Sequence, residues 1–292
     1  MTIDYRGKVA LVTGGAKGIG SGIALQFASS GARIAVIDVD AEAGIKTVGS
    51  VSQNCPQAVF VEADLSIPEE CYRATQEVAT QLGGIDVLIN NAGTIAWTRQ
   101  SSSDGIELTF ALNHLSYFLL TNLLIDVLRE SAPSRIVNVS SVAHMRADID
   151  LDDIQNPKRY RGLQAYGQSK LANLMFTYEL ARRLEGTGVT VNALHPGLVA
   201  TNLAANGKMP LGWISRPILH SALAVVGRSV TNGSKTVVYL ATAHDVAGIT
   251  GKYFVDKVAV PSSAASYYTD TARRLWELSS RLTNHSPGGS ST

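Results

Sequence analysis

The stretch "TGGAKGIG" (Thr13 to Gly20) follows an apolar run and opens a segment with helical periodicity. Glycines at Gly14, Gly18 and Gly20 allow a tight turn and a close approach of the backbone to a pyrophosphate, which would lie at the positive end of the helix. The spacing is Gly-x-x-x-Gly-x-Gly, which differs from the Gly-x-Gly-x-x-Gly of many dinucleotide folds. A glycine-rich turn without a ligand is the alternative. The stretch predicts a strand, loop and helix that bind a dinucleotide.

The rest of the chain alternates apolar, β-branched runs with segments of helical periodicity. The runs span residues 8–15, 33–40, 58–66, 85–93, 134–141 and 189–197. Near-continuous Val, Ile and Leu runs separated by helices are typical of a parallel sheet that is covered on both faces, with right-handed crossovers. We therefore expect an α/β fold, a single-domain Rossmann-type doubly wound parallel sheet of about seven strands with helices on both faces.

The domain organisation is expected to be simple, because no linker or internal repeat divides the sequence. One domain should span residues 1–283, with irregular insertions at 143–164 and 204–228. Glycine, proline and large apolar residues make 202–227 a candidate lid over a substrate, and a permanently packed helix pair is the alternative. Residues 284–292 should form a flexible tail.

Composition excludes several functional classes. The 292 residues carry a formal net charge of +1, which does not favour nucleic acid as a partner. The two cysteines, Cys55 and Cys71, are expected to be free thiols in a reducing cytoplasm. The N-terminus has no signal-peptide pattern, and no uncharged run reaches the roughly 18 residues of a membrane span. The six histidines show no metal-ligand spacing. We expect a cytoplasmic protein with no transmembrane anchor and no metal.

Asp38 ends the second apolar run, 18 residues after Gly20. An acidic side chain at the carboxyl end of this strand can accept a hydrogen bond from a ribose 2′-hydroxyl. Its alternative role is that of N-cap for the following helix. The position after a glycine loop favours the ribose.

Tyr166 and Lys170 lie four residues apart in "YGQSK", at the start of another helical segment. On a helix they share a face, and the ammonium group would favour the phenolate and lower the tyrosine pKa. Such a tyrosine can donate and accept a proton at cellular pH. The segment "YFVDK" (Tyr253 to Lys257) has the same spacing in a strand-like context, where residues four apart stand roughly 13 Å from each other. That second match cannot form the same pair.

An ordered series of motifs resembles the short-chain dehydrogenase/reductase family over nearly the whole chain. The series consists of "TGGAKGIG", Asp64-Leu65, "NNAG" (Asn90 to Gly93), Asn113, "VSS" (139–141), Tyr166 with Lys170, and "HPGLVAT" (His195 to Thr201). The resemblance implies an NAD(P)(H)-dependent oxidoreductase that interconverts an alcohol and the matching aldehyde or ketone.

The resemblance also implies roles for individual residues. Tyr166 would be the general acid/base, and Lys170 would lower its pKa and hold the ribose hydroxyls. Asn113 would anchor a water-linked proton path. Ser141 would hold the substrate oxygen, whereas Ser140 would be structural. The implied cofactor-binding residues are Gly14, Lys17, Gly18, Ile19, Gly20, Asp38, Asp64, Leu65, Asn91, Ala92, Gly93, Tyr166, Lys170, Pro196, Gly197, Val199 and Thr201.

One departure from the family pattern concerns the segment between Ser141 and Tyr166, which lie 25 residues apart, about twice the usual gap. This insertion, with "RIVNVSSVAH" and "KLANLMFTYELARRL", resembles a retinol-dehydrogenase-like branch and implies a lipophilic substrate. Family members usually form homodimers or homotetramers, often through the helices around Asn113 and Tyr166. The segment "FALNHLSYFLLTNLLI" is apolar on more than one face, which fits such double burial.

The sequence predicts NAD over NADP. The carboxylate of Asp38 would repel a 2′-phosphate, whereas Lys17 could attract one. A fixed carboxylate should outweigh a flexible lysine, which can turn into water or pair with Asp38. The alternative enzyme is an NADP-dependent carbonyl reductase of a biosynthetic pathway, and the alternative outside enzymes is a non-catalytic dinucleotide-binding regulator. The complete set of Asn113, Ser141, Tyr166 and Lys170 favours an enzyme.

Overall fold

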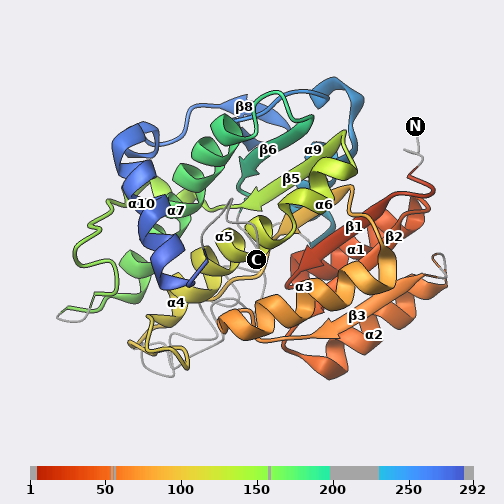
Figure 1. Cartoon of the computed structure of the whole chain (residues 1–292), viewed down its shortest axis with the longest axis horizontal. Coiled ribbons are helices and arrows are strands. Elements are labelled where there is room, and N and C mark those ends of the chain that lie inside the picture. The colour runs from red at the N-terminus through yellow and green to blue at the C-terminus, as the bar shows by residue number, and fades with distance from the viewer. Residues whose placement is uncertain (1–4, 54, 56, 157–158, 198–229, 286–292) are drawn as a thin grey trace, which may run out of the picture.

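The computed structural model describes residues 5–285 except 54, 56, 157–158 and 198–229, and its centre is one eight-stranded sheet (Figure 1). The strand order is β3-β2-β1-β4-β5-β6-β7-β8. The pairs from β3 to β7 are parallel, and β8 joins β7 in the antiparallel direction. The strands are β1 (Val9–Thr13), β2 (Arg33–Asp38), β3 (Ala58–Glu62), β4 (Val87–Asn90), β5 (Ser134–Val139), β6 (Val189–Leu194), β7 (Tyr253–Val255) and β8 (Val258–Val260). The predicted doubly wound sheet is confirmed, with β8 as an additional strand.

Helices cover both faces of the sheet. On one face, α1 (Gly18–Ser29), α2 (Ala41–Ser52) and α9 (Val230–Thr242) pack against alternate strand residues such as Ala10 and Val12. On the other, α3 (Pro68–Leu82), α5 (Ser116–Leu123) and α7 (Gly162–Arg183) pack against Val9 and Leu11. All five residues of β1 are buried, which explains its continuous apolar run. In the described part of the chain, the shorter elements are α4 (Leu108–Phe110), α6 (Ile125–Glu130), a π-helical turn (Ala111–Leu115) and three 3₁₀ turns (Val142–Arg146, His244–Val246 and Ala264–Tyr267).

The second Tyr-x-x-x-Lys match does not lie on a helix. Tyr253 belongs to β7, and Lys257 lies in the turn between β7 and β8. Asp256 and Lys257 have positive φ angles of 50° and 69°, as in the tight turns that join two antiparallel strands. The strand that contains Tyr253 therefore ends at Val255, earlier than the sequence suggested. The ammonium group of Lys257 lies 5.5 Å from the centre of the Tyr239 ring.

Helix α10 (Thr269–Leu282) covers α5 and α7 within the same chain (Figure 1). The Trp276 ring lies 5.0 Å from Phe118 of α5 and 5.8 Å from Phe176 of α7, between ring centres. The Arg183 guanidinium lies 4.1 Å from the centre of the same indole. Every residue of α7 from Gly167 to Ala181 is buried. The apolar surface of these helices, which suggested contact with another subunit, is thus covered by α10 of the same chain.

The predicted insertion at 143–164 is partly regular. Residues 143–146 belong to a 3₁₀ turn, and α7 begins at Gly162. Between them, Ile154 is buried, and the Tyr160 hydroxyl lies 2.8 Å from the Ala96 carbonyl and 2.9 Å from a Glu107 carboxylate oxygen. The insertion is therefore anchored to the segment that follows β4.

Several predicted segments lie wholly or partly outside the described residues. They are the candidate lid at 202–227, the second insertion at 204–228 and most of the tail at 284–292. Of the tail, Asn284 and His285 are described, and the His285 ring contacts the Tyr72 hydroxyl at 3.3 Å. In the part of the chain that the structure describes, no helix has the length and apolarity needed to cross a bilayer.

Candidate active site

Tyr166 and Lys170 lie one turn apart on α7, as the sequence predicted. The Lys170 ammonium nitrogen is 5.7 Å from the centre of the Tyr166 ring and 5.5 Å from that of Tyr117 on α5. It donates a hydrogen bond of 3.1 Å to the carbonyl of Val139, the last residue of β5. Lys170 is buried, whereas Tyr166 is partly exposed. This geometry directs the pair toward the carboxyl ends of the central strands.

Burial sets the proton affinities of both groups. Desolvation lowers the pKa of Lys170 to about 7. Desolvation also raises the pKa of Tyr166, and a hydrogen bond with Ser141 offsets part of that rise. The pKa of Tyr166 is therefore raised, whereas the sequence predicted a lowered one, because the cost of burying a phenolate outweighs the hydrogen bond with Ser141.

The serine pair after β5 divides into two roles. The Ser140 hydroxyl is buried and donates to the Lys170 backbone carbonyl at 2.9 Å, which fits the structural role expected of it. Ser141 begins the 3₁₀ turn Val142–Arg146, and its oxygen accepts a hydrogen bond from the Ala143 backbone N–H at 3.2 Å. Ser141 is partly exposed, and its side chain interacts with Tyr166.

Asn113 lies in the π-helical turn Ala111–Leu115, an irregularity that is frequent at functional sites. Its side-chain oxygen accepts from the Thr94 N–H at 2.7 Å, and its amide donates to Thr94 and to Ser169 at 3.0 Å each. A Cβ atom on Gly93 would lie 3.1 Å from the Asn113 side-chain oxygen and 3.5 Å from the Lys170 nitrogen. Asn113, Gly93 and Lys170 are therefore neighbours.

The glycine loop between β1 and α1 turns tightly against the segment that follows β4. Gly14 has a φ of +63°, and a Cβ there would lie 2.7 Å from the Ala92 Cα. A Cβ on Gly20 would overlap the Gly14 carbonyl. Lys17 is the N-cap residue of α1, and no described side chain caps the helix, which leaves its first N–H groups for an anion. Gly18 and Ile19 form this first turn.

Acidic residues surround the end of β2. Asp38 accepts hydrogen bonds from the backbone N–H groups of Ala16 at 2.9 Å and Asp40 at 3.1 Å. The N-cap of α2 is Asp40, which accepts from the Ala43 N–H, so the capping alternative for Asp38 is excluded. Lys17 forms an ion pair with Asp40, not with Asp38. The charge of Lys17 is thus neutralised by Asp40, which lies two residues after Asp38, the predicted ribose contact.

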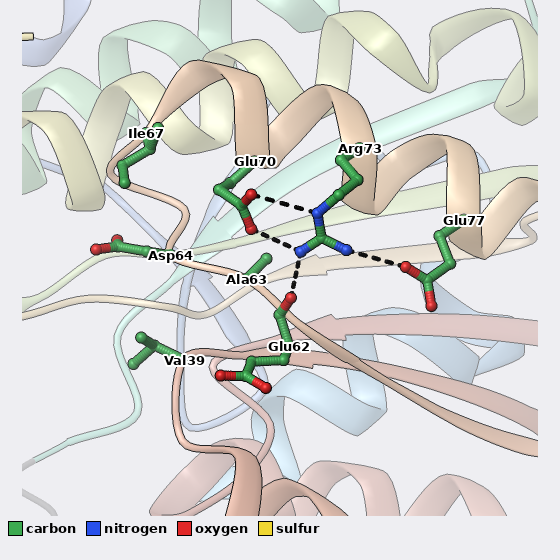
Figure 2. A pocket seen from close by; sticks show the side chains of 8 residues that line it. All are labelled: Val39, Glu62, Ala63, Asp64, Ile67, Glu70, Arg73 and Glu77. Carbon is green, nitrogen blue, oxygen red and sulfur yellow. Dashed lines mark hydrogen bonds and ion pairs between the residues drawn. The ribbon is translucent and has the colours of Figure 1, made fainter. Parts of the chain in front are cut away.

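A cavity of about 580 Å³ lies at the ends of β2 and β3 (Figure 2). Its lining includes Val39 and Asp64, and Asp64 accepts hydrogen bonds from the N–H and hydroxyl of Ser66 at 2.9 and 2.7 Å. The Leu65 side chain is in the core, so its backbone is what could face a ligand. This cavity includes Asp64, one of the predicted cofactor-binding residues, and Tyr166 is not part of its lining.

The cavity is acidic, although it contains one cation. Figure 2 shows the Arg73 guanidinium bound by Glu70, Glu77 and the Glu62 carbonyl. Glu62 is also the partner of Asp38 in the parallel register of β2 and β3. Arg73 is therefore already neutralised by its neighbours.

The remaining predicted residues flank the loop. The Asn91 amide donates to the carbonyls of Thr13 and Gly14 at 3.0 and 3.1 Å, which fixes the glycine loop on β4. After β6, the Gly197 N–H donates to His195 Nδ1 at 3.0 Å, and Pro196 lies between them. Val199 and Thr201 lie outside the described residues.

Sequence reasoning missed several residues that support the site. Thr13 accepts hydrogen bonds from the Asn91 and Ala92 N–H groups at 3.0 and 3.1 Å. Ser169 bonds Asn113, and Asp40 holds Lys17. An acidic residue near a lysine could have suggested only the last of these contacts.

Comparison with known proteins identifies the family. The sequence model of the family described as "short chain dehydrogenase" matches residues 8–209. The chain belongs to the short-chain dehydrogenase family. Among similar proteins, retinol dehydrogenase 14 of Mus musculus is 38% identical over 285 residues, which cover 94% of this chain and 85% of that protein. Retinol dehydrogenase 12 of Mus musculus is 37% identical over 282 residues, which cover 96% of this chain and 87% of that protein.

Solved structures agree with the fold of a short-chain dehydrogenase. An uncharacterized protein from Mycobacterium Paratuberculosis has a TM-score of 0.78 and 29% identity, with 98% of this chain and 97% of that chain covered. The Pseudomonas aeruginosa RhlG/NADP active-site complex has a TM-score of 0.67 and 28% identity, with 87% and 96% covered. The resemblance to the retinol-dehydrogenase-like branch is confirmed, and the protein is an NAD(P)-binding oxidoreductase that acts on CH–OH groups.

Proposed function

We propose that this short-chain dehydrogenase interconverts a lipophilic alcohol and its aldehyde or ketone, with Tyr166 as general acid/base and NAD(H) as the preferred cofactor. The observation that carries the proposal is the meeting of three groups at the carboxyl edge of the central strands. Ser141 follows β5 and interacts with Tyr166, while Lys170 reaches the last carbonyl of β5. Asn113 lies beside them, against the segment that follows β4.

The proposed chemistry uses these groups in distinct ways. When bound, the nicotinamide supplies or accepts the hydride at the substrate carbon. Tyr166 exchanges the proton with the substrate oxygen, and the Ser141 hydroxyl holds that oxygen in position. Lys170, with a pKa of about 7, can carry the charge that stabilises a transient phenolate. Gly14, Gly18, Ile19, Gly20, Asn91, Ala92, Gly93, Pro196 and Gly197 would hold the cofactor.

Exposed apolar side chains in the turn after Ser141 and at the start of α7 support a lipophilic substrate. They are Val142, Met145 and Leu163, which are 50%, 53% and 63% exposed. Val142 and Met145 share one side of their 3₁₀ turn, where residues three apart eclipse each other. Leu163 lies on the same side of α7 as Tyr166, three residues earlier. Large exposed apolar groups near a polar catalytic centre favour a substrate with a hydrocarbon portion.

Charge at the end of β2 supports NAD over NADP. Asp38, Glu62 and Asp40 place carboxylates around the expected ribose position. Lys17, the nearby cation that could attract a 2′-phosphate, is paired with Asp40. Two similar solved structures are complexes with NADP. The proposal of NAD for this chain rests instead on the charges of its own residues. An NADP-dependent carbonyl reductase remains the rival enzyme, and it predicts the opposite preference.

Two further parts of the proposal concern assembly and compartment. We propose a homodimer or homotetramer in the cytoplasm, as the sequence suggested. Because α10 covers α5 and α7, the contact between subunits would use another surface. Light scattering measures the assembly directly, and a mass equal to that of one chain would contradict it.

Replacing Tyr166 by Phe tests the catalytic role. The variant should fold and bind NAD but lose turnover by about 10²-fold or more, because the ring remains while proton transfer is abolished. Tyr253→Phe is the matched control, since Tyr253 is a buried tyrosine of β7 and should retain activity. The measurement is kcat with a series of lipophilic alcohols. Near-normal turnover by Tyr166→Phe would exclude the proposed chemistry, and a protein that binds NAD without any turnover would support the non-catalytic regulator.

Asp38→Ala tests the cofactor preference. Wild-type kcat/KM should favour NAD by at least about tenfold, or about 1.4 kcal/mol, and the variant should lose most of that preference. Asp38→Ala combined with Asp40→Asn should favour NADP, because Asn retains the α2 cap while releasing Lys17. A wild-type enzyme that prefers NADP would contradict the proposal.

A further inference from the structure

A buried histidine connects Ser141 to a distant part of the chain. His144 lies in the 3₁₀ turn that Ser141 begins, and its side chain is buried. Its Nδ1 lies 2.6 Å from the Ser141 carbonyl, and its Nε2 lies 3.3 Å from the Ser263 backbone N–H nitrogen. A carbonyl can only accept and an N–H can only donate, so the ring is neutral with its proton on Nδ1. The edge-on ring of Tyr253, 5.0 Å away between centres, holds the imidazole plane.

The far end of this connection is itself fixed to α7. The Tyr178 hydroxyl lies 2.6 Å from the Ser262 hydroxyl, which lies 2.6 Å from that of Ser266. The Ser262 N–H donates to the Tyr267 hydroxyl at 3.0 Å, and the Tyr267 ring stacks on Tyr178 with centres 5.1 Å apart. Segment 262–267 is thus a rigid support for the Ser263 N–H.

The near end is tightly packed against the residue that follows Tyr166. A Cβ on Gly167 would lie 3.1 Å from the Ala143 carbonyl and 3.3 Å from the Ala147 Cβ. Small displacements of the 3₁₀ turn therefore change the position of the Ser141 hydroxyl relative to Tyr166. Misplacement of a reacting group by about 1 Å can cost on the order of 10²-fold in rate.

We infer that His144 is a positioning residue, which holds the Ser141 hydroxyl at Tyr166 by tying the 3₁₀ turn to the Ser263 N–H. The inference rests on the proposed function, because its effect is read in the reaction of Ser141 and Tyr166. His144 itself acts only through the backbone of Ser141 and does not touch the substrate.

Ser263 provides a matched pair of variants. Its φ of −59° is the angle that proline adopts, so Ser263→Pro replaces the N–H donor by a ring carbon that cannot bond His144. Within the described part of the chain its hydroxyl has no hydrogen-bond partner, so Ser263→Ala removes a group that the connection does not use. Ser263→Pro should lower kcat by about tenfold or more, with the NAD dissociation constant within about twofold of wild type. Ser263→Ala should match wild type in both.

His144→Asn tests the same connection from the other side, and it is decisive if Ser263→Pro does not fold. The Asn amide can still donate to the Ser141 carbonyl but cannot reach Ser263. Its kcat should fall as in Ser263→Pro, and the double variant should lose no more than either single one, because all three remove one connection. Losses that multiply in the double variant, or wild-type kcat in folded His144→Asn, would overturn the inference.

The pH profile separates positioning from general destabilisation. The hydrogen bond with Ser141 lowers the pKa of Tyr166, so a displaced Ser141 should move the rising limb of alcohol oxidation to higher pH. Lys170 and Tyr117, the other titratable groups beside Tyr166, are unchanged in these variants. An unshifted limb would overturn the inference. Full activity of Tyr166→Phe would instead reject the proposed function, so the two failures are distinguishable.

Discussion

At the scale of single residues, the site depends on an ammonium group that the fold has taken out of water. Lys170 is buried beside Tyr117 and Tyr166, and its pKa falls to about 7. Below that pH the folded protein must bury a charge, which costs free energy. Between pH 7 and the ordinary lysine pKa of 10.5, the unfolded chain binds a proton that the folded chain lacks. The free energy of unfolding should therefore rise with pH over this range.

Lys170→Met isolates this contribution. From pH 7 to pH 9 the wild type should gain stability relative to the variant, on the order of 2 kcal/mol in the free energy of unfolding. Urea unfolding of both proteins at each pH measures the difference. The same comparison between pH 5 and 6 is the control, because both states of the wild type are then protonated. A difference that is constant from pH 7 to 9 would contradict the burial of a neutral lysine.

At the scale of elements, α10 stabilises the helices that carry the site. Trp276 contacts Phe118 and Phe176, and Arg183 lies over its outer face. Trp276→Ala should lower the free energy of unfolding by about 3–5 kcal/mol, because a large aromatic group leaves a cavity between three helices. Trp276→Phe, which retains an aromatic ring, should lose clearly less. Thermal or urea unfolding tests both, and an alanine variant as stable as wild type would contradict this packing.

At the scale of the whole molecule, the sequence was sufficient for the order of strands and helices along the chain, and it named residues that the fold brings to one edge of the sheet. Periodicity and the glycine loop are local signals, and the motifs keep their order along the chain. The partners of those residues could not be predicted, because they come from distant segments. Ser263 meets His144 across 119 positions, and α10, which lies much later in the chain, packs on α7. The predicted direction of the Tyr166 pKa shift was wrong for the same reason, because the burial that raises this pKa is set by the whole fold.

The short strand β8 also has a consequence for the behaviour of the protein at high concentration. A sheet that ended at β7 would expose unpaired backbone groups on which another chain could add a strand. Here β8 pairs with that edge, is only three residues long, and is bracketed by Lys257 and Pro261. A charged residue and a proline at an outer edge both oppose further strand addition. The hairpin therefore opposes edge-to-edge association on this side of the folded molecule.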